Sequence, residues 1–143
     1  MKNETLFKTI RSEFSHTKNM INYKREGSLL HIKSYKFADR IVKMYLHLKD
    51  DYKLNAIYTQ ILRSGTSISA NVHESEFAQS RADFVTKLSI ALKEANETMN
   101  WLNLLKDNDC ITPREFSSMA NDCSEVIAIL VASIKTAKNN NDN

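Results

Sequence analysis

Residues 60–74 read QILRSGTSISANVHE, and this stretch decides the expected fold. Ile61, Ile68 and Val72 return at helical spacing, and Gly65 lies on the same side. A second face of the same helix carries a polar stripe, which consists of Gln60, Arg63, Ser67, Asn71 and Glu74. Small residues let a neighbouring helix approach closely, and buried polar groups need hydrogen-bond partners. The pattern therefore predicts a helix that is contacted on more than one side.

The composition indicates a single all-α domain. A chain of 143 residues can bury a core without staples, and this one holds only two glycines and one proline, too few for the turns of an all-β fold. The two cysteines lack metal-binding or CxxC spacing, so we expect a reduced, cytoplasmic protein with no metal or cofactor. The longest apolar run, Val126 to Ala132, is too short to span a membrane and is expected to be a core segment.

Four amphipathic segments predict a bundle over residues 28–138. Ser34, Ser80 and Thr112 are the expected N-caps. Pro113 takes the first helical position after Thr112, and Glu115 completes the capping box with Thr112. The expected helices run from Ser34 to about Lys49, about Lys53 to Phe77, Ser80 to about Lys106, and Thr112 to about Ala137. Because the connections are short, consecutive helices should be antiparallel, in up-down-up-down order.

The ends of the chain are expected to differ from the bundle. Residues 1–27 form a basic amphipathic arm with a helix from Asn3 to about Asn22, and residues 139–143 form a disordered tail. Residues 1–33 hold seven bases and three acids, whereas the remaining 110 residues hold 13 bases and 14 acids. Nucleic-acid binding, if present, is therefore assigned to Lys2, Lys8, Arg11, Lys18, Lys24, Arg25 and Lys33.

The polar stripe should face the third helix. If the second and third helices fold back near residue 78, Arg63 lies near Glu94 and Gln60 lies near Glu97. A charged arginine inside a bundle is costly unless it is paired, so Arg63 should be neutralised by one of these carboxylates. We name the set the polar seam, which comprises Gln60, Arg63, Ser64, Ser67, Asn71, Glu74, Glu94 and Glu97. It either fixes the helix register or lines a binding or catalytic pocket.

Sequence patterns for metal or catalytic sites are incomplete. Glu94 and Glu97 form Glu-x-x-Glu, whereas a di-iron bundle needs Glu-x-x-His. His73 begins a possible zincin motif, but Phe77 stands where that motif needs its second histidine. No nucleophile with a nearby base and no glycine-rich phosphate loop is evident, so we predict neither an enzyme nor a small-molecule site.

One enzymatic alternative stays open. Arg40 and His47, with six residues between them, resemble the Arg-x4–6-His pattern of helical HEPN ribonucleases. So short a pattern also arises by chance, and a solvent-facing pair is the favoured interpretation.

Longer motifs resemble a known family. RSGTSISANVHE (Arg63 to Glu74) and QSRADFVTKLSIALKEANETMNWLNLL (Gln79 to Leu105) resemble the bacterial four-helix-bundle proteins of the 23S rRNA intervening-sequence family. The resemblance extends from about Lys33 to Thr136 and includes the less distinctive segments FADRIV and TPREF. Ser69 and Ser75 depart mildly from it, because the family often has glycine or alanine there.

The resemblance implies an antiparallel four-helix protomer that assembles into a ring-like homopentamer, with a structural role for the polar seam. The chain is also similar to the accessory protein of diversity-generating retroelements, a basic pentamer that binds a reverse transcriptase and RNA. The nearly neutral bundle departs from that protein. The leading hypothesis is a non-enzymatic homo-oligomer that acts with RNA or a nucleic-acid-handling protein, and the alternative is a scaffold that binds only proteins, through the N-terminal arm.

Overall fold

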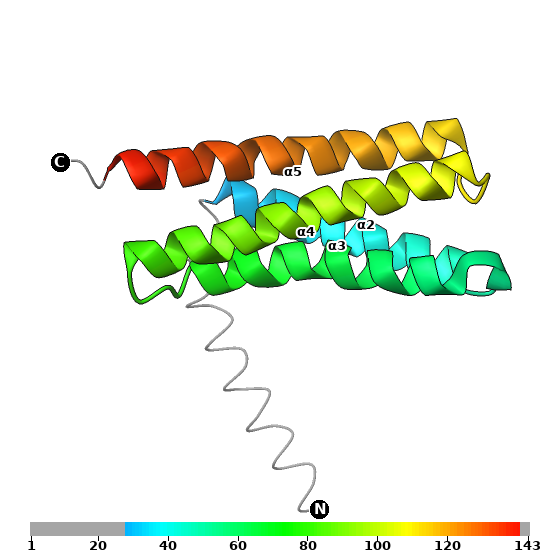
Figure 1. Cartoon of the computed structure of the whole chain (residues 1–143), viewed down its shortest axis with the longest axis horizontal. Helices are drawn as coiled ribbons and strands as arrows, with labels where there is room; N and C mark the ends of the chain where they lie inside the picture. The colour runs from blue at the N-terminus through cyan, green and yellow to red at the C-terminus, as the bar shows by residue number, and fades with distance from the viewer. Residues whose placement is uncertain (1–27, 141–143) are drawn as a thin grey trace, which may run out of the picture.

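The computed structural model describes residues 28–140, apart from the side chain of Tyr52. Four long helices and one short 3-10 helix make up this range (Figure 1). They are α2 (Leu29–Leu48), η1 (Tyr52–Leu54), α3 (Asn55–Ser75), α4 (Arg81–Asp107) and α5 (Pro113–Asn139). Consecutive long helices run in opposite directions, which confirms the predicted all-α, antiparallel bundle. The predicted arm, including the helix from Asn3 to Asn22, and the last three residues of the predicted tail lie outside the described range.

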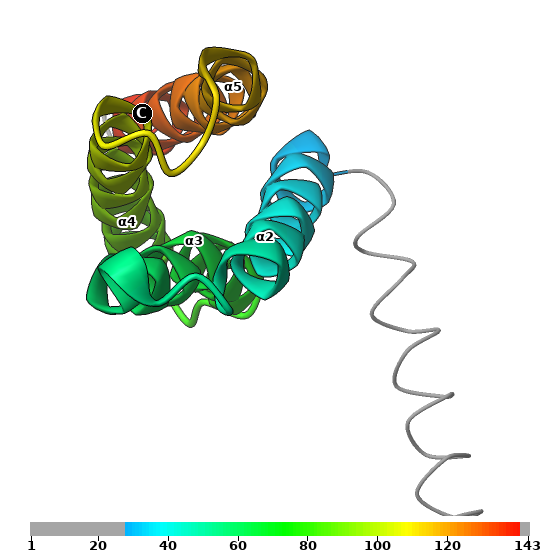
Figure 2. The same ribbon diagram turned by 90° about the vertical axis from the view of Figure 1, so that its right-hand side faces the viewer.

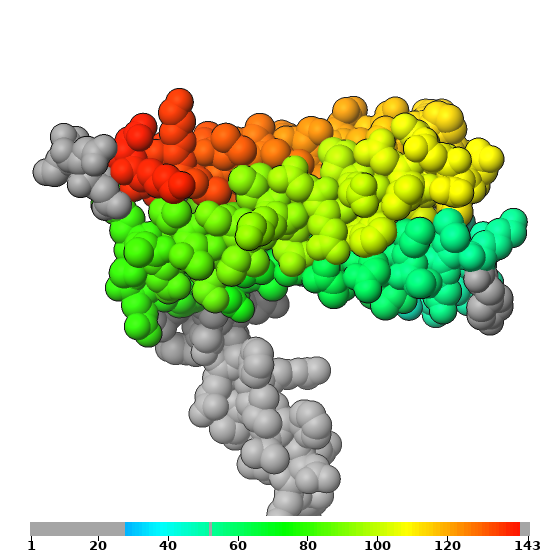
Figure 3. Space-filling model, viewed as in Figure 1, coloured from blue at the N-terminus to red at the C-terminus, as the bar shows by residue number. Residues whose placement is uncertain are grey.

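The helices follow one another around the bundle axis. Viewed end-on, α2 lies beside α3, α3 beside α4 and α4 beside α5 (Figure 2). The closing pair, α2 and α5, makes the least contact of the four neighbouring pairs. From the side, α5, α4 and α3 form one continuous face of the molecule (Figure 3).

The core contains apolar side chains from all four long helices. Its fully buried members are Phe37 and Ile41 of α2, Tyr58, Ile61 and Ile68 of α3, Leu88, Ala91, Ala95, Leu102 and Leu105 of α4, and Cys123 and Leu130 of α5. The Cys123 thiol donates a hydrogen bond to the Ala95 carbonyl at 3.4 Å. Its burial raises the pKa of Cys123 to about 12, which keeps the thiol protonated and unreactive near neutral pH.

The first bundle helix begins earlier than predicted. Ser28 is its N-cap, because the Ser28 hydroxyl accepts a hydrogen bond from the His31 amide at 3.2 Å. Ser34, the predicted cap, is buried inside α2 and donates to the His31 carbonyl at 3.1 Å. The prediction was wrong because Leu30 adds one more buried apolar position before Ser34.

The second bundle helix is shorter than predicted at both ends. The chain first makes the 3-10 turn of η1, where the Asp51 carboxylate accepts from the Lys53 amide at 3.4 Å. Therefore α3 begins at Asn55, two residues after the expected Lys53. It ends at Ser75 instead of Phe77, which is exposed.

The predicted caps of the last two helices are confirmed. Ser80 accepts from the Asp83 amide at 3.0 Å. Thr112 accepts from the Glu115 amide at 3.1 Å while the Glu115 carboxylate accepts from the Thr112 amide at 3.2 Å, which is a complete capping box. Between the two helices Asp109 adopts a left-handed φ of 58°, and this conformation lets the chain leave α4 and start α5 within a few residues.

Gly65 marks a close helix approach, as predicted. A Cβ atom at this position would lie 2.8 Å from both Cγ1 and Cγ2 of Ile41. A side chain can therefore be added to α3 here only if the Ile41 side chain shifts.

The apolar run from Val126 to Ala132 is a core segment only in part. Val126 and Leu130 are buried, but Ala128, Val131 and Ala132 are exposed. By length and composition α5 is the one helix of the described range that could cross a membrane. Only 22% of its apolar window is buried in the bundle. The run thus has two apolar sides, and one of them faces outward.

Candidate functional site

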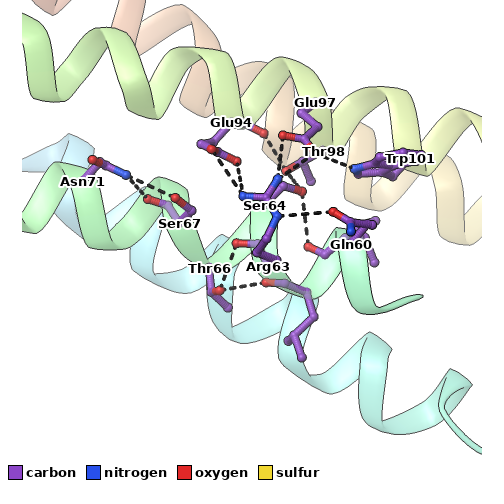
Figure 4. Close-up of polar contacts among 12 residues, drawn as sticks. Gln60, Arg63, Ser64, Thr66, Ser67, Asn71, Glu94, Glu97, Thr98 and Trp101 are labelled. Carbon is purple, nitrogen blue, oxygen red and sulfur yellow. Dashed lines mark hydrogen bonds and ion pairs between the residues drawn. The ribbon is translucent and has the colours of Figure 1, made fainter. Parts of the chain in front are cut away.

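The centre of the polar seam is an arginine that holds two carboxylates. Arg63 of α3 donates from Nη2 to Glu97 Oε1 at 2.7 Å and to Glu97 Oε2 at 2.8 Å (Figure 4). Its Nη1 reaches Glu94 Oε1 and Oε2 at 3.4 and 3.3 Å. The predicted pairing of Arg63 is confirmed, and it joins α3 to two successive turns of α4.

This arginine is not inside the bundle, contrary to the expectation. The Arg63 side chain is 49% exposed, and Glu94 and Glu97 are partly covered. The long arginine stem reaches the edge of the α3–α4 contact, so the charged group stays near water and avoids the cost of full burial. Gln60 contacts Glu97 only indirectly, because its amide oxygen accepts from Arg63 Nε at 3.3 Å.

The ion pairs shift the protonation of both partners towards the charged forms. The hydrogen bond from Arg63 is the main cause that lowers the pKa of Glu97, and Trp101 Nε1 adds a second donor at 3.2 Å. The same bond raises the pKa of Arg63. A carboxylate held ionised in this way is a poor proton donor near neutral pH, so this arrangement does not favour acid–base chemistry.

The buried part of the α3–α4 contact is a pair of hydroxyl groups. Thr98 Oγ1 of α4 lies 2.8 Å from Ser64 Oγ of α3 and 2.7 Å from the Glu94 carbonyl, and both side chains are fully buried. Ser64 was predicted as part of the polar seam, but Thr98 was not. Its signal was present, since Thr98 is a polar residue one helical turn after Glu94 on the face that points towards α3.

The rest of the polar seam does not form one connected network. Asn71 Nδ2 donates to the Ser67 carbonyl at 2.9 Å and to Ser67 Oγ at 3.2 Å, which are contacts within α3. Glu74 accepts from Lys87 Nζ of α4 at 2.8 Å. The contacts support the interpretation that the seam sets the register of α3 against α4, and this role stays a prediction.

Of the seven predicted nucleic-acid contacts, only Lys33 lies in the described range. Lys33 Nζ is 2.9 Å from Glu125 Oε1 of α5, and this hydrogen bond raises the pKa of Lys33. The lysine charge is therefore paired with a carboxylate in a contact between α2 and α5. Lys2, Lys8, Arg11, Lys18, Lys24 and Arg25 lie outside the described residues.

Arg40 and His47 line one groove of about 450 Å³ between α2 and α5. The Arg40 guanidinium is already bound there, because Nη2 donates to Ser118 Oγ at 2.8 Å and Nη1 donates to the Ser118 carbonyl at 3.3 Å. Nη1 also donates to a carboxylate oxygen of Asp122. The two residues share a groove, as the ribonuclease hypothesis requires. However, the Arg40 guanidinium already forms hydrogen bonds with side-chain and backbone oxygens of α5.

A further set of polar side chains meets where α2 begins and α3 ends. His31, His73 and Glu76 each offer one possible metal-ligating atom, and these three atoms lie within 4.8 Å of one another. This set was not predicted, because the zincin pattern relates His73 to Phe77 and not to Glu76. The spacing His73-x-x-Glu76, which places both residues on one helix face, was the available signal.

Comparison with known proteins shows a matching family model and similarity to solved structures. A family model described as 23S rRNA-intervening sequence protein matches residues 30–132. A solved structure from Bacteroides thetaiotaomicron VPI-5482, described as a protein with unknown function from the S23 ribosomal protein family, is 50% identical with a TM-score of 0.73. The match covers 75% of this chain and 99% of that chain. None of the curated proteins compared matches the chain.

Proposed function

The chain belongs to the 23S rRNA-intervening sequence protein family, and on this premise we propose that it is a non-enzymatic, homo-oligomeric binding protein. Five copies form the assembly, which acts with RNA or with a nucleic-acid-handling protein such as a reverse transcriptase. The family assignment supports the bundle but names no partner. Self-association is supported by an apolar face of α5, and RNA binding by the basic N-terminal sequence.

The outward side of α5 is the observation that carries self-association. Ala128, Val131 and Ala132 are spaced for one face of the helix and are exposed, and Val131 keeps 49% of its surface open to solvent. An apolar stripe of this kind on a long helix favours coverage by another protein surface. A second copy of this chain is the occupant that a homo-oligomer supplies.

A membrane is the other environment that an apolar helix face fits. The charges of α5 argue against it, because the Asp122 and Glu125 carboxylates would be costly to place inside a bilayer. A cytoplasmic location belongs to the same proposal, and the unpaired thiols of Cys110 and Cys123 support it.

The association face can be tested with a matched pair of charged substitutions. Val131→Asp places a charge in the outward stripe of α5, whereas Leu46→Asp places one at an equally exposed apolar residue of α2. We expect Val131→Asp to lower the assembly mass in light scattering and Leu46→Asp to leave it unchanged. Equal masses for both variants and the parent chain would rule out this face.

The choice between RNA and a protein partner depends on the N-terminal bases. Because the residues after position 33 carry 13 bases and 14 acids, electrostatic binding of RNA must come mainly from the first 33 residues. Replacing Lys2, Lys8, Arg11, Lys18, Lys24 and Arg25 with glutamine should abolish binding of a labelled single-stranded RNA, and added salt should weaken binding to the parent chain steeply. Lack of binding by the parent chain at low salt would favour the protein-only scaffold.

The groove that Arg40 and His47 share keeps ribonuclease activity as a second candidate. If His47 acts as the base in RNA cleavage, His47→Ala should abolish degradation of a labelled RNA by the purified chain. Undiminished degradation in that variant would eliminate this candidate.

A further inference from the structure

The cluster of His31, His73 and Glu76 brings together the first turn of α2 and the last turn of α3. His31 is the third residue of α2, whereas His73 lies in the last turn of α3 and Glu76 directly follows that helix. Because the two helices are antiparallel, these ends meet. His31 Nδ1 lies 3.3 Å from Glu76 Oε1, and a ligating atom of His73 lies within 4.8 Å of both.

The donor set matches the coordination chemistry of zinc. Zn²⁺ takes imidazole nitrogen and carboxylate oxygen at about 2.0–2.2 Å, and two histidines with one glutamate leave a fourth position for water. Two ligands of a tetrahedral ion at these bond lengths lie about 3.3–3.6 Å apart. The contact of 3.3 Å between His31 Nδ1 and Glu76 Oε1 lies within this range, and the ligating atom of His73 lies within 4.8 Å of both.

The surroundings restrict both solvent and side-chain motion. The His31 and Glu76 side chains are only 13% and 19% exposed. The His31 ring stacks on Tyr35 with ring centroids 6.4 Å apart, and the His73 ring packs on Phe77 at 5.4 Å. His31 and Glu76, which are partly buried and already in contact, lose less entropy on binding a metal than exposed side chains do.

We propose that His31, His73 and Glu76 bind one zinc ion, with water as the fourth ligand. The ion would link α2 to α3 at the end of the bundle where residues 1–27 join it. Metal bound only by the folded chain adds its binding free energy to the stability of the fold, so zinc should stabilise this end of the bundle. The competing interpretation is a histidine–glutamate ion pair that holds the two helices without a metal.

Zinc titration of the full chain separates these interpretations. After treatment with a chelator, the parent protein is titrated with Zn²⁺ in competition with a chromophoric chelator, and thermal melting is recorded with and without the ion. We expect one equivalent to bind per chain and to raise the melting temperature. His73→Gln should weaken binding at least tenfold and remove the thermal shift. Failure of the parent chain to bind, or to gain thermal stability, would overturn the proposal.

Two further variants guard against misfolding and against zinc at other residues. Glu76→Gln keeps the shape of the side chain but removes the anionic ligand, so it should also weaken zinc binding at least tenfold while circular dichroism stays that of a helical bundle. His47→Gln alters an exposed histidine of α2 outside the cluster and should leave binding unchanged. Equal zinc affinity in the His73, Glu76 and His47 variants would place the ion elsewhere and contradict the assignment.

Discussion

The contact between α3 and α4 and the contact between α2 and α5 are built in different ways. The α3–α4 contact is the most extensive in the bundle and contains the buried Ser64–Thr98 pair, with the Arg63 ion pairs along its edge. The α2–α5 contact is the least extensive, and its polar links are half-exposed ion pairs beside an open groove.

This difference indicates that the α3–α4 contact contributes more to the stability of the fold, whereas the α2–α5 contact tolerates substitution. Substitutions that disrupt buried contacts lower the free energy of unfolding strongly. Half-exposed ion pairs contribute little to that free energy and are screened by salt. A binding protein can therefore change its α2 and α5 surfaces with small losses of stability. The substitutions below test that ranking.

Truncation of the core on the α4 side should have the largest effect. Leu102 is fully buried, so Leu102→Ala is expected to lower the free energy of unfolding by about 2–5 kcal/mol, from lost burial and the cavity left behind. Leu46→Ala, at an exposed residue of α2, is the control and should change it by less than about 0.5 kcal/mol. Chemical denaturation measures both, and equal losses would show that burial does not separate the two regions.

Removal of one buried hydroxyl should have the next largest effect. Thr98→Val keeps the side-chain shape but removes the hydroxyl that contacts Ser64 across the two helices. Because Ser64 still donates to the Ile61 carbonyl at 3.4 Å, we expect the free energy of unfolding to fall by about 0.5–1.5 kcal/mol. Thr98→Ser keeps the hydroxyl and serves as the comparison for polarity. If Thr98→Val were as stable as the parent chain in denaturant, the hydroxyl pair would not stabilise the α3–α4 contact.

Loss of the α2–α5 ion pair should have a smaller effect. The Arg40 and Asp122 side chains are 38% and 41% exposed, so their coupling in a double-mutant cycle of Arg40→Gln and Asp122→Asn should be about 0.2–1 kcal/mol. The coupling should shrink further in high salt. A salt-insensitive coupling above about 2 kcal/mol would make this contact as strong as a buried one.

The pH dependence of Glu97 should give the smallest effect. Because Arg63 lowers its pKa below the ordinary value of 4.5, Glu97 stabilises the fold above its unfolded pKa, and this stabilisation is lost as the pH falls through the lower folded pKa. Glu97→Gln should therefore be less stable than the parent chain at pH 7, and the gap should close in acid. A gap in melting temperature that stays constant from pH 7 to acid would contradict this account.

Local signals predicted much of the fold. The capping box at Thr112 and Glu115 and the cap at Ser80 involve neighbouring residues, so the sequence contains all that is needed to place them. The pairing of Arg63 with Glu94 and Glu97 followed from the position of the turn before α4. Ser34 was misplaced because Ser28 and Ser34 both precede helix-compatible residues, and only the burial of Leu30 decides between them.

Two features that depend on contacts between helices, the histidine cluster and the exposure of Arg63, were not predicted from the sequence. The same fold-back reasoning, applied about the turn between α2 and α3, pairs position 31 with position 73 and would have found the histidine cluster. The exposure of Arg63 could not be predicted in this way, because helical spacing places its Cα on a face but does not say where a long side chain ends.

We propose that this bundle works as an assembly of identical chains that cover the outward side of α5. Sedimentation equilibrium of the full chain over a range of protein concentrations tests it most directly. We expect a mass of about five 143-residue chains. A mass of one chain at every concentration would contradict it, and the apolar residues of α5 would then need a different partner.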